Sequence, residues 1–152
     1  MRQQRGTKVH PNPKATRGQP TKARVIRVRT AWNLASAAIP KSQRISGIVI
    51  DAREHAVDPS MSPEVIDMQG KLVYGSTSYS RSKAVNRGPV GYAYSMDDRN
   101  VGQRVGSNPL FIQAVGSLDD DVYITSMDAE KVRDAEKSFG VLSNCRVMLL
   151  LQ

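Results

Sequence analysis

Residues 46–75 read SGIVIDAREHAVDPSMSPEVIDMQGKLVYG, and this stretch decides the fold. Its first apolar run, Ile48 to Ile50, predicts a buried strand that carries the chain into a polar loop. Pro59 and Pro63 stiffen that loop because each proline ring fixes its own φ angle. The stretch therefore begins as a strand followed by a rigid polar loop.

The second half of the same stretch predicts a hairpin. An apolar run over 65–68 turns at Gln69 and Gly70 and returns over 71–74. Since glycine adopts positive φ without a Cβ clash, a two-residue turn fits here. The segments downstream are expected to supply partner strands for this region.

Further elements follow from apolar runs and from capping residues. Short apolar or alternating runs predict strands over 90–94, 110–115, 122–125 and 145–151. Two helices are predicted, one over Ser80 to Arg87 ending at Gly88, and one over Met127 to Ser138 ending at Gly140. The second helix is expected to bury Met127, Val132, Ala135 and Phe139. The last strand is apolar on both faces, which predicts a central position.

These elements predict the fold class. Five to seven strands and about two short helices occur without strict strand–helix alternation, which favours an α+β fold with a mixed or antiparallel sheet. We expect a single α+β domain over 22–152, preceded by a disordered basic tail over 1–21, because the tail is too polar to bury a core.

The charge of the chain is divided unevenly between its two parts. The formal net charge is +8, but residues 1–44 carry 11 Lys or Arg and no Asp or Glu. Residues 45–152 carry the other 11 basic residues and all 14 acids, so this part is net acidic. Such asymmetry is typical of an arm for an anionic partner.

The segment after the tail alternates basic and aliphatic residues. This pattern over 24–29 predicts a half-buried strand with a cationic face, and Arg24, Arg27 and Arg29 are its candidate residues for binding an anionic partner. The apolar segment from Trp32 to Ile39 is either a short helix or an irregular cover for the sheet.

Four ionisable residues cluster just after the first strand. Asp51, Glu54, His55 and Asp58 could in principle serve acid–base catalysis, which often occurs at this position of a fold. A catalytic pair would need a nucleophile with a positioned base, and no such motif is present. We therefore expect a structural loop and no enzyme, with no catalytic, cofactor-binding or metal-binding residues.

Two other segments have a functional and a structural interpretation. The glycines of 102–109 could hold a phosphate together with Arg104, but the Lys and Ser or Thr of a phosphate-binding loop are missing. A polar loop over 97–108 is favoured, with Asn108 held in an extended conformation by Pro109. The acidic triplet 119–121 is expected to be a hairpin loop rather than a calcium site. Asp51, Arg53, Arg104 and Asn108 are thus predicted structural loop residues.

The positions of cysteine and histidine and the hydropathy of the sequence argue against a metal site, a transmembrane helix and a secretory signal. Cys145 is the only cysteine and lies in an apolar run, which predicts a buried, inert thiol. His10 and His55 lack metal-ligand spacing. No run of 18 apolar residues is present, so no transmembrane helix is expected. The first residues lack the apolar core of a secretory signal.

From Ser46 onward the sequence resembles the C-terminal region of FlgP-like lipoproteins, bacterial envelope proteins linked to the flagellar basal disk. The resemblance rests on GIVIDAR (47–53), MSP (61–63), VYG (73–75), GYA (91–93), RVGSNPL (104–110), DA (128–129) and CRV (145–147). Residues 24–40 are also similar to the last strand of the preceding domain in such proteins, so that 22–44 could end that domain.

The resemblance implies an α+β scaffold that is periplasmic, is tethered to the outer membrane and assembles with copies of itself or with flagellar proteins. It implies no catalytic role. The family's signal peptide and lipidated cysteine are not found in this sequence, and without them the expected location is the cytoplasm. The alternative function is a cytoplasmic nucleic-acid-binding protein that uses the basic arm, and an enzyme built on Asp51 and His55 ranks third.

Overall fold

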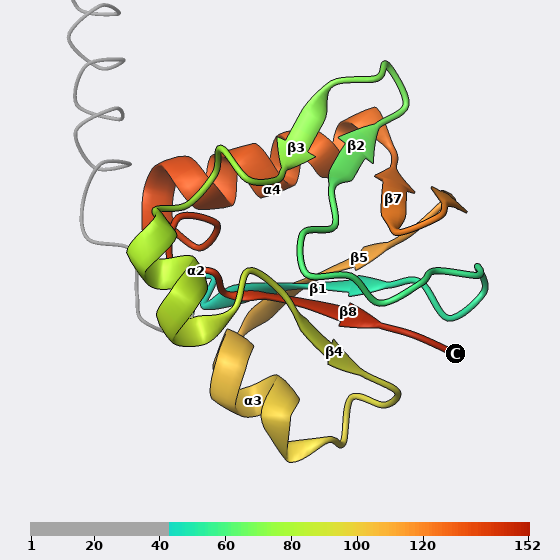
Figure 1. Ribbon diagram of the computed structural model, residues 1–152. Helices are drawn as coiled ribbons and strands as arrows, with labels where there is room; N and C mark the ends of the chain where they lie inside the picture. The colour runs from blue at the N-terminus through green and yellow to red at the C-terminus, as the bar shows by residue number, and fades with distance from the viewer. Residues whose placement is uncertain (1–42) are drawn as a thin grey trace, which may run out of the picture. The chain divides into compact units, whose positions relative to one another are not determined.

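Two four-stranded sheets and three helices make up the part of the chain that the computed structural model describes, residues 43–152 (Figure 1). The strands are β1 Gly47–Asp51, β2 Val65–Asp67, β3 Leu72–Tyr74, β4 Gly91–Ala93, β5 Pro109–Gln113, β6 Gly116–Leu118, β7 Asp121–Ile124 and β8 Val147–Leu150. The helices are α2 Arg81–Arg87, α3 Arg99–Val105 and α4 Ser126–Phe139.

The α+β class predicted from the sequence is confirmed. The described residues hold eight strands and three helices, more than the five to seven strands and two helices expected, and the strands form two sheets. The predictions for the tail, for the strand with Arg24, Arg27 and Arg29, and for 32–39 lie outside the described residues.

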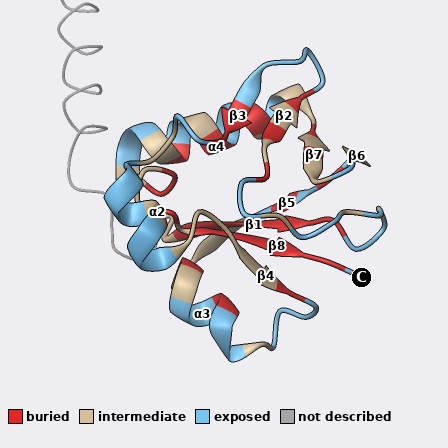
Figure 2. Cartoon of the chain, in the orientation of Figure 1, coloured by how far each residue is buried: buried red, intermediate tan, exposed pale blue. Residues whose placement is uncertain are grey.

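The first sheet is entirely parallel, in the order β4-β8-β1-β5. Its two central strands, β1 and β8, are buried along their whole length (Figure 2). Strands covered on both faces read as continuous apolar runs, which explains why Ile48 to Ile50 and the end of the chain could be predicted as strands. The predicted burial of Cys145 is also confirmed, although it precedes β8 and has a φ of 55°.

Successive side chains of β1 and β8 point to opposite faces of the parallel sheet, so the buried residues form two hydrophobic clusters. Ile48 and Ile50 face the larger cluster, which lies between the parallel sheet, the second sheet and α4. Val49 and Met148 face the smaller cluster, where they meet α3. The parallel sheet therefore separates α3 from the second sheet and α4 (Figure 1).

The second sheet is mixed, in the order β3-β2-β7-β6. Its β2–β3 hairpin is the one predicted from the sequence, and Gly70 at the turn has a φ of 81°. A second hairpin joins β6 and β7; Asp119, with a φ of 54°, and Asp120 form its loop as predicted, but Asp121 begins β7 and pairs with Leu118. Strand β6 was not predicted because Gly116–Leu118 has almost no apolar pattern.

Helices α2 and α4 confirm the predictions made from their capping residues. Ser80 caps α2 by accepting a hydrogen bond from the Lys83 amide, and Thr125 caps α4 in the same way at Asp128. The residues that α4 buries are Ala129, Val132 and Ala135. Met127 was expected in this face but is 70% exposed, so that part of the prediction is wrong.

The polar loop predicted over 97–108 is largely a helix, α3, and the prediction is corrected here. Asp98 caps it, and Val101 and Val105 are buried against the parallel sheet. Asn100 and Gly102 have low helix propensity, which hid the element in the sequence. The helix forms because its two valines, spaced four residues apart, share a face that packs on β1, β4 and β8.

The two sheets are joined where β5 leads into β6. The Ala114 amide donates to the carbonyl of Asp51 in the parallel sheet at 2.9 Å. The next amide, that of Val115, donates to the carbonyl of Tyr123 in the mixed sheet at 2.8 Å. Consecutive residues thus belong to different sheets.

Candidate functional site

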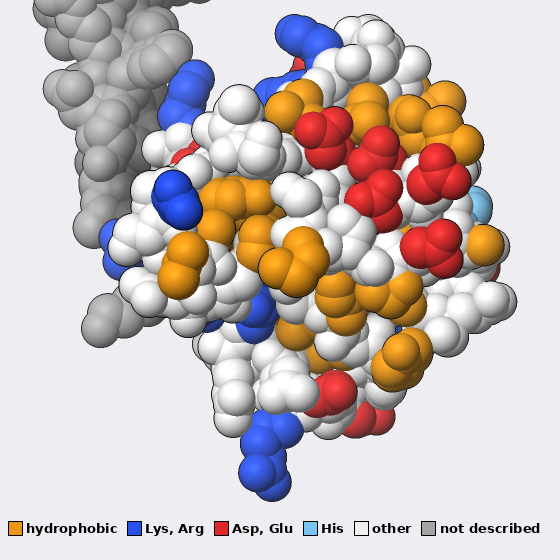
Figure 3. Space-filling model, viewed as in Figure 1, with side chains coloured by type: hydrophobic (Ala, Val, Ile, Leu, Met, Phe, Trp, Pro, Cys, Tyr) orange, Lys and Arg blue, Asp and Glu red, His pale blue; other side chains and the backbone are white. Residues whose placement is uncertain are grey.

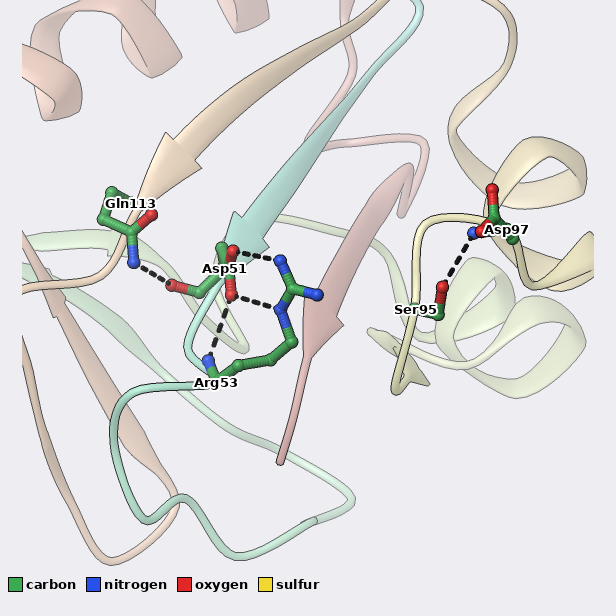
Figure 4. A network of polar contacts seen from close by, with 5 residues as sticks. All are labelled: Asp51, Arg53, Ser95, Asp97 and Gln113. Atoms are coloured by element: carbon green, nitrogen blue, oxygen red, sulfur yellow. Dashed lines mark hydrogen bonds and ion pairs between the residues drawn. The ribbon is translucent and has the colours of Figure 1, made fainter.

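Asp51 lies at the carboxyl end of β1, the edge of a parallel sheet where ligands commonly bind. Arg53 surrounds its carboxylate with three hydrogen bonds (Figure 4). The amide and Nε of Arg53 donate to Oδ1 at 3.1 Å and 2.9 Å, and Nη2 donates to Oδ2 at 2.7 Å. Both oxygens of the carboxylate therefore accept hydrogen bonds from Arg53 in the same loop, as expected for a structural role.

The pKa shifts of Asp51 and Arg53 agree with a structural role for this ion pair. The hydrogen bonds from Arg53 hold the pKa of Asp51 below its ordinary value, although burial opposes them. Asp51 in turn raises the pKa of Arg53. Gln113 on the neighbouring strand β5 donates to the backbone carbonyl of Asp51 at 3.3 Å rather than to its side chain (Figure 4). A carboxylate with a lowered pKa is a weaker base, so it is poorly suited to abstracting a proton.

His55 does not join Asp51. Its Nε2 lies 3.2 Å from the carbonyl oxygen of Ala114, so the imidazole holds the loop against the end of β5. After the carboxyl end of β4, the Asp97 amide donates to Ser95 Oγ, a contact that is likewise internal to its loop (Figure 4). The structure thus does not bring the proposed acid–base residues together.

The loop between β1 and β2 is anchored along its length. Tyr92 Oη accepts from the Ser60 amide at 2.9 Å and donates to the Ser60 carbonyl at 2.8 Å. The Asp58 amide donates to the carbonyl of Asp119, and Ser117 Oγ donates to the carbonyl of Ala56. Burial raises the pKa of the Tyr92 phenol. These contacts tie the proline-containing stretch to Tyr92 of β4 and to the β6–β7 hairpin.

Acidic residues gather where this loop meets the β6–β7 hairpin. Asp121 accepts from the Glu64 amide through Oδ1 at 3.2 Å, which brings the loop and the hairpin together. Figure 3 shows acidic side chains grouped on the mixed-sheet side of the visible face. Within residues 43–152, no group of three His, Cys, Asp or Glu side chains could hold a metal ion.

Arg104 and Arg87 form a second polar centre, and it links the ends of two helices. Arg104 Nη1 donates to the carbonyls of Gly88 and Cys145 at 3.2 Å and 2.9 Å, and Nη2 donates to that of Arg87 at 2.6 Å. Arg87 Nη2 donates back to the carbonyl of Arg104 at 2.8 Å. Each guanidinium therefore caps the carboxyl end of the other's helix.

A recess of about 400 Å³ adjoins this pair. Helix α3 contributes Arg104, Asn100 and Gln103, helix α2 contributes Arg87, and the sheet contributes Gly91, Tyr92 and Met148. Arg104 was predicted as a structural loop residue, with phosphate binding as the less favoured interpretation. It instead lies in the last turn of α3 and binds backbone carbonyls.

Asn108, predicted as a structural loop residue, links the starts of two strands through three hydrogen bonds. Its amide donates to Ser46 Oγ at 2.9 Å, and its side-chain Nδ2 donates to the carbonyl of Arg44 at 2.9 Å. Its own carbonyl accepts from the Ser46 amide, so Asn108 fixes the start of β1 beside the start of β5.

Two polar residues of the described region were missed by sequence reasoning. Asp67 is 1% exposed and accepts from the amides of Gln69 and Lys71, both at 2.9 Å. Its other oxygen accepts from Arg133 of α4 at 3.0 Å. An Asp at the first position of a turn that ends in Gly, as in Asp67 to Gly70, was the signal that could have revealed it.

Comparison with known proteins gives one family. Residues 47–152, more than two thirds of the chain, match the family model described as Treponema pallidum Tp0624, second domain. None of the curated proteins compared with the chain matches it. Over residues 43–152, no helix is long and apolar enough to cross a membrane.

Proposed function

The chain belongs to the family of the Treponema pallidum Tp0624 second domain, and we propose that it is a non-enzymatic structural module of the bacterial cell envelope that assembles with copies of itself. The resemblance to FlgP-like lipoproteins extends this proposal to the flagellar basal structure and to an outer-membrane location. The family and the resemblance concern the same part of the chain, from residue 46 or 47 to its end.

The use of the polar residues supports a structural role. Asp51, Arg53 and His55, the strongest catalytic candidates in the sequence, each bind a group of the fold itself. Among the described residues, every buried side-chain nitrogen or oxygen has a hydrogen-bond partner. Polar groups that are engaged in this way hold loops rigid, which suits a module that other proteins pack against.

The observation that carries self-association is the edge strand β5, which pairs with β1 alone among the described residues. This strand ends the parallel sheet and has no charged residue in its sequence, PLFIQ. Phe111 on it is 47% exposed, because α3 lies over β1, β4 and β8. Proteins that stay monomeric usually protect such an edge with charges, so we propose that β5 pairs with a second copy.

Light scattering coupled to size-exclusion chromatography tests this pairing. We expect the molar mass of the full chain to rise with concentration and to fall to that of a monomer in Phe111→Lys. The control is Val85→Lys on α2, because Val85 is also apolar and is 74% exposed but lies away from β5. A monomer at every concentration, or equal loss of assembly in both variants, would contradict pairing through β5.

Cell fractionation tests the location, and nucleic-acid binding tests the alternative function. The proposal expects the protein in the envelope fraction of the native organism. The 11 basic residues of 1–44 favour the alternative, in which binding weakens steeply with salt and is lost when residues 1–29 are deleted. That result, together with a cytosolic location, would replace the envelope module by a nucleic-acid-binding protein.

A further inference from the structure

Arg87 and Arg104 bring two positive charges together at the recess between α2, α3 and β4. In the described region neither residue takes part in an ion pair, and all their partners are backbone carbonyls. Burial, and next the charge of Arg87, lower the pKa of Arg104. The carboxyl ends of two helices offset part of this positive charge, but each supplies only about half an elementary charge.

Several donors of the two guanidinium groups remain after these bonds. A guanidinium has five N–H groups, and Arg104 uses three of them on carbonyls. Arg87 donates only through Nη2, which leaves its Nε and Nη1 groups. The hydrogen bonds to backbone carbonyls therefore use only some of the N–H groups of Arg87 and Arg104, and the remaining N–H groups can donate to another acceptor.

Gly91 makes room for this arrangement on the edge strand β4. A Cβ atom at Gly91 would lie 2.5 Å from Arg104 Nε and 2.9 Å from the Met148 side chain. Only glycine allows the arginine to lie flat against the strand, and the arginine then forms one wall of the recess. A residue with any side chain would displace the guanidinium that the site depends on.

The rest of the recess is suited to an oxyanion. Asn100 and Gln103 add side-chain amides next to the two arginines, and none of the lining residues is acidic. A volume of about 400 Å³ holds a phosphate or carboxylate group together with part of the molecule that carries it. We propose that this recess binds a small oxyanion, a phosphate or a carboxylate group, through Arg87 and Arg104.

This proposal does not rest on the envelope function, and it is tested on the full chain. Sodium phosphate and sodium acetate are titrated separately, at constant ionic strength set with sodium chloride, and backbone amide shifts are followed by NMR. We expect saturable shifts centred on Gly91 and Gln103 with at least one of the two anions. The anion that binds more tightly identifies the group that the natural ligand carries.

Two variants and a control make the test specific. Arg87 is exposed, so Arg87→Gln should fold normally and weaken binding about tenfold or more, since charge-assisted hydrogen bonds are lost. Gln103→Ala keeps both charges and should weaken binding by a smaller factor. Arg81→Gln removes an exposed arginine of the same helix that does not line the recess and should leave binding unchanged.

Three results would overturn the site. The first is a set of shifts that sodium chloride reproduces, and the second is a titration that never saturates. The third is equal weakening in Arg87→Gln and Arg81→Gln, which would mean that the anion responds to net charge and not to the recess. Amide spectra of the free variants show whether each one is folded, so a misfolded variant cannot imitate the expected loss.

Discussion

Asp51 and His55 belong to a cluster of ionisable residues, yet each binds a different group of the fold. In the sequence they stand four positions apart after a buried strand, where an acid–base pair is plausible. In the fold the Asp51 carboxylate turns back to Arg53, and His55 reaches the carbonyl of Ala114. The difference arises because Arg53, two residues after Asp51, presents a planar pair of donors that matches a carboxylate.

Substitution of these two residues separates a structural loop from a catalytic one. We expect Asp51→Ala to lower the free energy of unfolding by about 1–2 kcal/mol, because the Arg53 amide and guanidinium lose their acceptor. His55→Ala should cost less, since it removes one contact to a carbonyl at 3.2 Å. Urea unfolding followed by circular dichroism measures both. Unchanged stability in Asp51→Ala would show that the ion pair does not hold the loop.

At the scale of elements, the packing of α3 on β1 depends on Gly47. A Cβ atom there would lie 2.6 Å from Val105 Cα and 2.7 Å from its carbonyl oxygen. Backbone atoms cannot move aside as a flexible side chain can. Gly47 therefore permits the close approach that buries Val101 and Val105.

Gly47→Ala and Gly102→Ala should have opposite effects on stability. We expect Gly47→Ala to destabilise by about 1–3 kcal/mol, the usual cost of overpacking a core. Gly102 lies inside α3 with no atom within 4 Å of an added Cβ, so Gly102→Ala should stabilise by about 0.5–1 kcal/mol. Denaturant midpoints give both values. Destabilisation by both substitutions would mean that α3 tolerates no change at all, and that the close approach at Gly47 is not the cause.

The elements that could be predicted from sequence carry their own local signals. Helix α4 has a capping Thr125, a terminal Gly140 and fourteen residues between them, and β8 is a continuous apolar run. Helix α3 has only seven residues and two buried positions. A helix of that length is marginal alone and forms through packing on the sheet, which no local pattern reveals.

The same reasoning applies to the candidate sites. The contact of Asp51 was predictable because its partner, Arg53, lies two positions away, and Asn108 was notable because Pro109 restricts its backbone. The partners of Asn108 were not predictable, since Ser46 and Arg44 lie 62 and 64 positions away. The partners of Arg104 are the carbonyls of residues 87, 88 and 145, which lie 17, 16 and 41 positions away. Sequence reasoning could identify Arg104 as notable, but only the fold shows that it faces Arg87.

At the scale of the whole molecule, two paired carboxylates make stability depend on acid. The pKa of Asp67 is lowered by the Lys71 amide first and then by Arg133, and the pKa of Asp51 is lowered by Arg53. Both fall below the ordinary value of 3.8, which the unfolded chain keeps. Their contribution is therefore complete above that value and is lost as pH falls through the folded pKa values.

Urea unfolding between pH 7 and pH 3 tests this dependence. We expect Asp67→Asn to be less stable than the parent protein at pH 7 and to approach it as the pH falls below 4. Asparagine still offers an oxygen to the Gln69 and Lys71 amides, so the turn should persist while the ion pair with Arg133 is lost. The control is Asp134→Asn, because Asp134 is exposed on the same helix as Arg133. A constant difference between parent and Asp67→Asn at every pH would contradict the assignment.

The junction at Ala114 and Val115 couples the two sheets through the backbone. Two adjacent amides are bonded to different sheets, so the backbone between the sheets contains no slack that could serve as a hinge. The two sheets cannot separate at this point unless the hydrogen bonds donated by the Ala114 and Val115 amides break. A pull on the outer strand β6 is therefore passed directly to β1 in the middle of the core.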